Sequence, residues 1–301
     1  MVIFPEKIKK IAVIAPAGVP NETDFNASLR FVESLGYDIK IGNHIFNNKG
    51  IDYLSSSIEN RVTDIHSCWK DDSIDLVIAA KGGFGSAQLL PFLNWELLKT
   101  RNLPFVGYSD LTALHLGMYA KGVGIPISAP MFCQFHKLRN DNYTLNSLCN
   151  SIQYARKAEQ VTEVRHHRKL LIIKKRSIEA EVLPVTLSVL VSLIGTSFMP
   201  DVKGRILLIE DINEPVYKLD RYLTHLMQAG ILNRISGLLC GYFTRCGNQK
   251  ERIELFNSWS KFVNGPVIMN IPFGHTYPRI SIAFGERCIV KDNGEIILDN
   301  C

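Results

Sequence analysis

The feature that most constrains the fold is a series of short apolar runs, each closed by a glycine or proline turn. In the first half of the 301-residue chain these runs are 11–15, 76–80 and 104–106. Helical spacing of apolar residues lies between or after them, at 26–35, 57–69 and 111–120. Short buried strands that alternate with helices are typical of a parallel sheet covered on both faces. The turns that follow these strands are therefore expected to lie together on one rim of the sheet.

The second half is richer in strand-like runs. They lie at 206–209, 237–240, 267–271, 288–290 and 296–298, with one clear helix predicted at 216–229. The composition changes between about 140 and 176, which predicts a domain boundary near residue 150. We therefore expect an α/β protein. Residues 1–150 would form an N-terminal parallel-sheet domain of the Rossmann or flavodoxin type, and residues 151–301 a smaller, strand-rich C-terminal α/β domain.

Composition excludes several classes of protein. Hydrophobic residues make up 46% of the chain and charged residues 21%, which is ordinary for a globular protein and excludes a disordered or fibrous one. The formal charge of +5 is spread over the chain without the basic stripe of a nucleic-acid binder. The seven cysteines contain no C-x-x-C pair, so neither a disulfide framework nor a zinc knuckle is expected. The cysteines therefore predict a protein of a reducing compartment.

Three segments resemble targeting, membrane or ligand signals. Residues 7–18 imitate a signal peptide, but their apolar core is too short. The longest uncharged run, 182–200, contains Pro184, Gly195 and Pro200, so we expect a buried helix just after Pro184 and no membrane span. The basic run 165–169 is expected to be a solvated loop. A metal or phosphate site is disfavoured there because the two adjacent histidines point apart.

The first candidate for chemistry is Gly107-Tyr108-Ser109-Asp110, where a predicted strand ends and a helix begins. Backbone N–H groups at a helix start can stabilise negative charge on an attacked carbonyl oxygen. The tetrapeptide is similar to a nucleophile elbow, although Leu111 stands where the α/β-hydrolase pattern has glycine. Taken alone, it leaves two interpretations open: Ser109 caps the helix, or it attacks a substrate.

The second candidate is Lys81-Gly82-Gly83-Phe84-Gly85, which follows a predicted strand. Its three glycines permit a close backbone approach and positive φ. The pattern is neither G-x-G-x-x-G nor a P-loop. It is either a tight turn or a loop whose free N–H groups face Ser109 across the rim.

Two further candidates follow strands in the second half. Glu210 is crowded by Asp211 and Glu214, which indicates either a charge cluster at a helix start or an acid in a site. A metal site is disfavoured because no histidine lies at metal-motif spacing. His275 lies on a Gly/Pro-bent loop, where a lone histidine is usually structural. Together the chain order is Ser109, Glu210, His275, an order that α/β-hydrolases also use, although geometry rather than order defines a triad.

Across nearly its whole length the chain resembles the serine LD-carboxypeptidases, a family that includes muramoyltetrapeptide carboxypeptidases and microcin-immunity peptidases. The resemblance rests on several motifs in the family's order. These are Ala15-Pro16-Ala17-Gly18, Lys81-Gly82-Gly83-Phe84-Gly85, Gly107-Tyr108-Ser109-Asp110, Leu193-Ile194-Gly195-Thr196, Ile209-Glu210-Asp211-Ile212-Asn213-Glu214 and Phe273-Gly274-His275.

The resemblance implies a role for each site residue. Ser109 would be the nucleophile, His275 the general base and Glu210 the residue that orients His275. The N–H groups of Asp110 and of Gly82 or Gly83 would form the oxyanion hole. The serine would lie in the N-terminal domain and the other two residues in the C-terminal one, so the site would close only when the domains dock.

The resemblance also implies a reaction and a setting. The family's usual reaction removes the terminal D-alanine of the murein tetrapeptide during cytoplasmic cell-wall recycling, and it needs neither a metal nor an organic cofactor. Family members are commonly homodimers. The only expected partners are therefore a murein-derived peptide and a second copy of the chain, with no nucleic acid and no membrane.

Departures from the family pattern leave the substrate open. Pro184-Val185-Thr186 replaces a frequent Gly-Gly-Asn, and Ala17, Phe84 and Lys81 replace serine, tyrosine and arginine. Lysine lacks the planar fork that grips a carboxylate, so Lys81 is only a weak candidate for binding the substrate carboxylate. Three alternatives remain: the same triad acting on a peptidyl-nucleotide or another amide, a peptide-binding homologue with little turnover, and an ordinary esterase.

Overall fold

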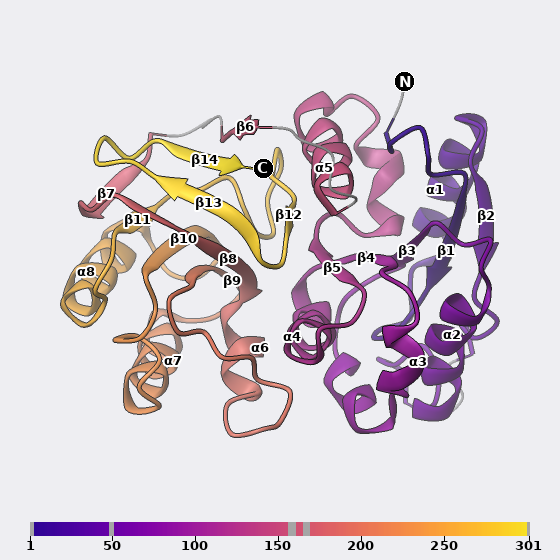
Figure 1. Cartoon of the computed structure of the whole chain (residues 1–301), viewed down its shortest axis with the longest axis horizontal. Coiled ribbons are helices and arrows are strands. Elements are labelled where there is room, and N and C mark those ends of the chain that lie inside the picture. Colours follow the sequence, from indigo (N-terminus) through magenta and orange to yellow (C-terminus); the bar gives the residue numbers. More distant parts are fainter. Residues whose placement is uncertain (1–2, 48–50, 156–160, 165–168, 300–301) are drawn as a thin grey trace.

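The computed structural model describes residues 3–47, 51–155, 161–164 and 169–299. Two sheets stand side by side in it, each with its own helices (Figure 1). The first, sheet A, has six strands, and its members are parallel except for the edge strand β12. Its spatial order is β12 (Ile282–Ala283), β5 (Ile125–Ser128), β4 (Pro104–Gly107), β3 (Leu76–Ala79), β1 (Lys10–Ile14) and β2 (Asp38–Ile41).

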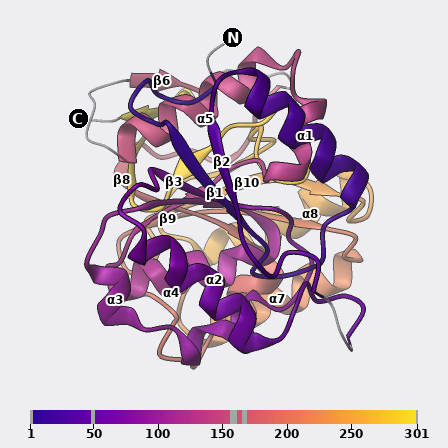
Figure 2. The same cartoon turned by 90° about the vertical axis from the view of Figure 1, so that its right-hand side faces the viewer.

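Sheet A confirms the predicted α/β class. Alternate residues of its central strands face two different cores, since Ala12 and Ile14 pack into one cluster while Ile11 and Val13 pack into another. That explains why these strands read as continuous apolar runs. Helices cover both faces of the sheet (Figure 2). They are α1 (Glu22–Ser34), α2 (Ile58–Lys70), α3 (Trp95–Lys99), α4 (Thr112–Lys121) and α5 (Asn142–Ala155), with the short 3₁₀ helices η1 (Ser86–Phe92), η2 (Ser109–Leu111) and η3 (Phe132–Lys137).

Sheet B occupies the second half and has eight strands of mixed direction. Its spatial order is β6 (Val161–Glu163), β14 (Ile296–Asp299), β13 (Glu286–Val290), β8 (Ile178–Thr186), β9 (Ile206–Ile212), β10 (Gly237–Thr244), β11 (Val267–Met269) and β7 (Leu171–Lys174). The central strands β8, β9, β10 and β11 are parallel. Its helices are α6 (Leu187–Ser192), α7 (Val216–Gln228), α8 (Gln249–Trp259) and η4 (Ser260–Phe262).

The helix expected just after Pro184 starts later than predicted. Pro184 lies inside β8, and α6 begins only at Leu187. Pro184 is tolerated in the strand because β8 pairs with β13 only as far as Val182, so the missing N–H interrupts no bond on that side. No described helix is both long enough and apolar enough to cross a membrane. Residues 165–168 of the basic run lie outside the described residues.

One hydrophobic cluster joins the two sheets. It contains Ala12 and Val77 from sheet A and continues through Leu207 and Leu238 of sheet B. Polar contacts support this junction, since the Tyr119 hydroxyl donates to Glu181 Oε2 at 2.6 Å. The predicted boundary near residue 150 falls inside α5, and we keep the division at that point as a prediction.

The strand β12 crosses from the second half of the chain into sheet A. It pairs antiparallel with β5, through Ile282 with Ser128 and Ala283 with Ile127. The segment before it therefore bridges the two sheets.

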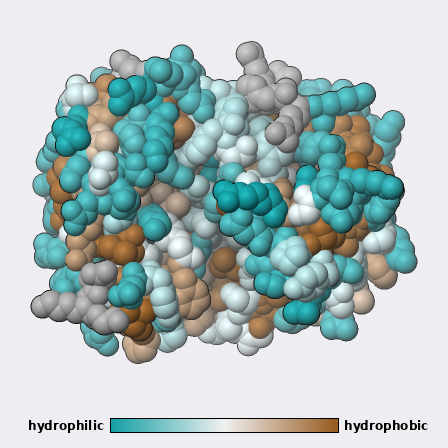
Figure 3. All heavy atoms as spheres, turned by 180° about the vertical axis from the view of Figure 1, so that it is seen from behind, coloured by the Kyte–Doolittle hydropathy of each residue, from teal (hydrophilic) through white to brown (hydrophobic). Residues whose placement is uncertain are grey.

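The face opposite to that of Figure 1 is mostly hydrophilic, and its hydrophobic patches are interrupted by polar side chains (Figure 3).

Candidate active site

Ser109 stands on the turn between β4 and α4, as the strand-to-helix pattern predicts. Its φ is +62°, in the left-handed region that non-glycine residues rarely occupy. This conformation turns the side chain out of the sheet at the start of η2. Such strain costs about 1–3 kcal/mol, and it is typically found where a side chain must be presented to a ligand.

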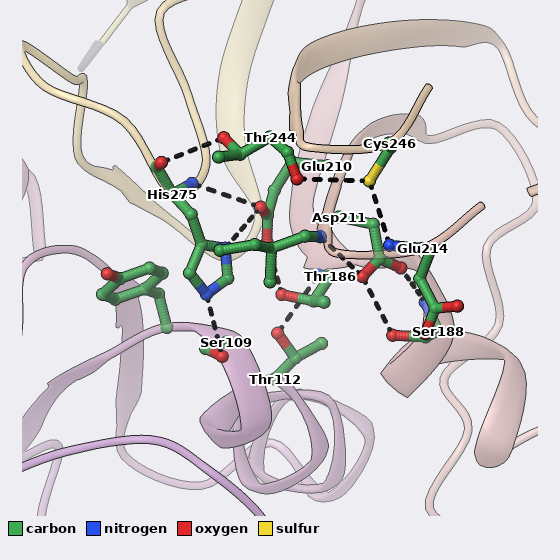
Figure 4. A network of polar contacts seen from close by, with 12 residues as sticks. Ser109, Thr112, Thr186, Ser188, Glu210, Asp211, Glu214, Thr244, Cys246 and His275 are labelled. Carbon is green, nitrogen blue, oxygen red and sulfur yellow. Dashed lines mark hydrogen bonds and ion pairs between the residues drawn. The ribbon is translucent and has the colours of Figure 1, made fainter. Parts of the chain in front are cut away.

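Three side chains from distant parts of the chain meet here (Figure 4). His275 Nε2 lies 3.1 Å from Ser109 Oγ, and His275 Nδ1 lies 2.8 Å from Glu210 Oε2. Glu210 belongs to β9 and is 1% exposed, while His275 follows β11. An ionised carboxylate only accepts hydrogen bonds, so the Nδ1 proton faces Glu210 and Nε2 is left to accept the serine proton.

Glu210 is held by contacts on both of its oxygens. The Thr186 hydroxyl donates to Oε1 at 2.5 Å, and the His275 backbone N–H donates to Oε2 at 3.3 Å. The Thr186 N–H in turn donates to Thr112 Oγ1 at 3.2 Å, at the start of α4. Thr186 thus links the carboxylate to the helix that follows Ser109. It stands within the Pro184-Val185-Thr186 departure, and no local pattern in the sequence points to this role.

The other two carboxylates of the predicted cluster have different functions. Asp211 accepts hydrogen bonds from the Ser188 N–H at 2.8 Å and the Ile212 N–H at 2.9 Å, so it caps α6. Burial, opposed by these hydrogen bonds and aided by the neighbouring Glu210, raises the pKa of Asp211 to about 6. Glu214 pairs with Lys218 one turn along α7. Within the described part of the chain, no group of three or more His, Cys, Asp or Glu side chains is arranged to hold a metal ion.

The glycine loop lies against Ser109, on the rim predicted for it. A Cβ atom added at Gly82 would stand 3.2 Å from Ser109 Cβ and 3.3 Å from its Oγ. The Gly82 carbonyl accepts from the Gly18 N–H at 3.0 Å, which joins this loop to the turn after β1. Gly83 and Gly85 have φ of +112° and +114°, so this loop depends on glycine at both positions.

Two buried side chains, Asp110 and Arg61, stabilise the loops of this rim by hydrogen bonds to their backbone. Asp110 is buried, and its carboxylate accepts from the Ser86 N–H at 2.8 Å. Burial raises the pKa of Asp110, against the effect of its bonds to Ser86. Arg61 is 1% exposed and donates from Nη1 to the carbonyls of Pro16 and Gly85, both at 3.0 Å. Burial lowers the pKa of Arg61. Its position within α2 gave no hint that it binds two loops of the site.

A pocket of about 400 Å³ opens beside His275. Its polar lining includes Thr244, Arg245, Gln249, Arg252 and Asn270. Arg245 is exposed and has a φ of +54°. Lys81, the weak candidate for binding the substrate carboxylate, donates to the Val19 carbonyl at 3.3 Å and does not line this pocket. The pocket therefore offers a cationic surface beside His275.

Comparison with known proteins decides the family. Residues 11–127 match the LD-carboxypeptidase N-terminal domain, and residues 179–290 match the LD-carboxypeptidase C-terminal domain. The chain belongs to the LD-carboxypeptidase family. This confirms the resemblance read from the motifs, and it makes the protein a serine-type hydrolase of the LD-carboxypeptidase class.

Curated relatives cover almost the entire chain. A probable murein peptide carboxypeptidase of Bacillus subtilis (strain 168) is 28% identical over 93% of this chain and 88% of its own. A murein tetrapeptide carboxypeptidase of Pseudomonas aeruginosa is also 28% identical, over 94% of each chain.

Solved structures confirm the fold. An MccF-like protein from Bacillus anthracis superposes with a TM-score of 0.86 at 24% identity, over 98% of both chains. A muramoyltetrapeptide carboxypeptidase from Oxalobacter formigenes gives a TM-score of 0.80 at 26% identity, over 97% of this chain and 98% of that one. The predicted arrangement of a parallel-sheet α/β domain followed by a second, strand-rich one is that of these proteins.

Proposed function

We propose that this LD-carboxypeptidase hydrolyses the L,D peptide bond of a murein tetrapeptide and releases its terminal D-alanine. The observation that carries the proposal is the continuous chain of hydrogen bonds from Ser109 Oγ through the His275 ring to Glu210. The names of the curated relatives, murein peptide and murein tetrapeptide carboxypeptidases, support the substrate class.

The proposed reaction has two halves. Ser109 Oγ attacks the carbonyl carbon while His275 Nε2 takes the hydroxyl proton, and the same proton then passes to the leaving amine of D-alanine. Water repeats the sequence on the acyl-enzyme and frees the shortened peptide. Glu210 keeps the Nδ1 proton of His275 in place and stabilises the imidazolium that forms in each half.

Backbone donors would stabilise the oxyanion. We assign this role to the N–H of Asp110 and to one N–H of the Gly82-Gly83 turn, because that turn packs against Ser109. Loss of one such donor typically costs about 2.7–4 kcal/mol of transition-state stabilisation. Arg245 and the polar lining of the adjacent pocket are suited to a carboxylate of the peptide. The cytoplasmic location and the homodimer implied by the family resemblance stay predictions.

Substitution of each triad residue tests the proposal. Ser109→Ala and His275→Ala should each lower D-alanine release from the tetrapeptide by about 10⁴-fold or more, and Glu210→Ala by about 10⁴-fold. Release would be followed by mass spectrometry, with thermal unfolding to show that each variant is folded. Ser258→Ala, on the exposed end of α8, is the control and should keep normal turnover. Normal turnover by Ser109→Ala would end the proposal.

A second substrate class has one observation in its favour. The cationic pocket beside His275 would also accept the phosphate of a peptidyl-nucleotide, and the B. anthracis neighbour is named as MccF-like. Both substrates should be offered to the same enzyme preparation. Turnover of the nucleotide conjugate without release of D-alanine from the tetrapeptide would favour this alternative, with the same triad.

A further inference from the structure

The segment from His275 to Phe284, here called the strap, leaves the candidate site and enters sheet A. Three backbone N–H groups of the strap, among other contacts, donate hydrogen bonds to the N-terminal half. The Arg279 N–H donates to Thr144 Oγ1 at 3.0 Å, the Ser281 N–H to Ser147 Oγ at 2.8 Å, and the Phe284 N–H to the Pro126 carbonyl at 3.0 Å. The imidazole at one end of the strap is thus tied to the half of the molecule that carries the serine.

Arg279 is an unusual residue in the middle of this strap. Its side chain is 0% exposed, and Nε, Nη1 and Nη2 have no hydrogen-bond partner among the described residues. The guanidinium lies over the ring of Tyr108, with Cζ 4.0 Å from the ring centroid, and 5.5 Å from the centroid of Phe273. Aromatic faces are therefore its principal described neighbours.

Such an arrangement destabilises the folded state. A buried cation without a carboxylate loses its hydration and regains only part of that free energy from aromatic rings. Side chains that break the rules of polar satisfaction are found where function benefits from them. Arg279 cannot bind the substrate directly because it is fully buried. Any effect that it has on the site must therefore pass through the residues that it contacts.

Those neighbours flank the reacting groups. Tyr108 immediately precedes Ser109, and Phe273 lies two residues before His275. The Tyr108 ring also packs against the His275 ring, with centroids 4.9 Å apart, and its hydroxyl accepts from Gln134 Nε2 at 2.8 Å. A single guanidinium therefore touches the aromatic residues next to both the nucleophile and the base.

We propose that Arg279 is a positioning residue that holds the rings of Tyr108 and Phe273 so that the His275 imidazole meets Ser109 Oγ. The proposal rests on the function proposed above, because it assigns His275 the role of the base. The guanidinium packs on the Tyr108 ring and lies near the Phe273 ring. The Tyr108 ring in turn packs against the imidazole and limits its movement. Relaxation of this contact would let the imidazole tilt away from the hydroxyl.

Arg279→Met tests the role by separating activity from stability. The methionine fills similar space without the charge, so the melting temperature should stay the same or rise. The kcat for D-alanine release should fall by about 10- to 100-fold, since a displacement of about 1 Å in a site can cost 10²-fold, while KM changes little. Arg279→Lys keeps a cation over the rings and should retain more activity than Arg279→Met.

Two further measurements distinguish positioning from a merely structural role. In a double-mutant cycle on kcat, Arg279→Met and Tyr108→Leu should be strongly non-additive, because each removes the same contact. The ring-proton resonances of His275 in an NMR spectrum should shift in Arg279→Met, because the Tyr108 ring moves relative to the imidazole. Arg234→Met, in the exposed turn between α7 and β10, is the matched control and should alter none of these quantities.

Several results would overturn the proposal. They are a normal kcat in folded Arg279→Met, additive effects in the cycle, or a loss of activity that merely follows a fall in melting temperature. If Arg279→Met does not fold, Arg279→Lys and Tyr108→Leu decide the matter, and normal kcat in both would overturn it. Failure here is distinct from failure of the proposed function, which Ser109→Ala alone decides.

Discussion

A buried carboxyl group, that of Glu286, lies two residues beyond the strap, and its pKa falls in a pH range that denaturation experiments can cover. Glu286 begins β13, is 2% exposed, and accepts a hydrogen bond from the Ala283 N–H at 2.9 Å. Burial raises the pKa of Glu286 to about 8 from an ordinary value of 4.5, and this hydrogen bond only partly opposes the rise. The folded protein therefore holds a proton on Glu286 under conditions in which the unfolded chain has released it.

The magnitude follows from proton linkage. The stability that Glu286 contributes is fully present below pH 4.5 and is lost as the pH rises through about 8, because the folded state binds the extra proton in that window. Each pH unit within the window costs about 1.4 kcal/mol, which amounts to about 5 kcal/mol over the whole range. Asp211, with a pKa of about 6, affects the same slope mainly below that value. Burial lowers the pKa of His115 to about 3, which acts in the opposite direction as its unfolded form releases its proton near pH 6.5. The difference between wild type and Glu286→Gln isolates Glu286, and that difference should amount to about 2 kcal/mol between pH 6.5 and 8.

Urea denaturation of wild type and Glu286→Gln at a series of pH values measures this loss. Glutamine keeps an acceptor for the Ala283 N–H but cannot ionise. Between pH 6.5 and 8 the free energy of unfolding of Glu286→Gln should therefore fall by about 2 kcal/mol less than that of wild type. Glu254→Gln, on the exposed face of α8, is the control and should follow wild type. Parallel pH profiles for wild type and Glu286→Gln would refute the reasoning, because they would mean that Glu286 ionises normally in the folded protein.

Two glycine substitutions probe the packing of the site. Gly274→Ala places a Cβ 2.8 Å from Glu210 Cβ and Oε2 at a φ of +110°. The substitution should abolish D-alanine release and lower the unfolding free energy by about 1–3 kcal/mol, and a normal melting temperature would contradict this prediction. Gly82→Ala needs only a shift of a few tenths of an ångström at Ser109. The protein should melt normally while kcat falls by about 10- to 100-fold, and an unchanged kcat would contradict the proposed role of this loop beside Ser109.

The order of apolar runs and turns in the sequence accounts for much of the fold and for the place of each candidate residue near a strand end. Ser109, Glu210 and His275 were each expected at the end of an apolar run, and the structure brings them within hydrogen-bonding distance. Parallel strands carry their carboxyl ends to one rim, which accounts for the glycine loop beside Ser109 in sheet A and for Glu210 beside His275 in sheet B. The contact between Ser109 and His275 joins the two sheets and depends on how the sheets pack. Whether these residues catalyse the reaction stays a prediction that the substitutions above will decide.

Other features have no local signature. Thr186 supports Glu210 only because β8 and β9 pair in one register, and Arg61 reaches two loops from the middle of a helix. The strand β12 has two residues, too few for any periodicity, and no local pattern marks Arg279, three residues before it, as buried. Each of these roles depends on long-range packing that a single sequence does not display.

The packing also bears on how the site is assembled. The family resemblance led us to expect a site that closes only when two domains dock. In the structure, one hydrophobic cluster extends from Ala12 of sheet A to Leu238 of sheet B, and the strap adds a strand of the second half to sheet A. Separation of the halves would expose that cluster and break the β12–β5 pairing together. The distance between Ser109 and His275 is therefore set by the same contacts that hold the fold, and we expect the hydroxyl and the imidazole to meet before substrate arrives.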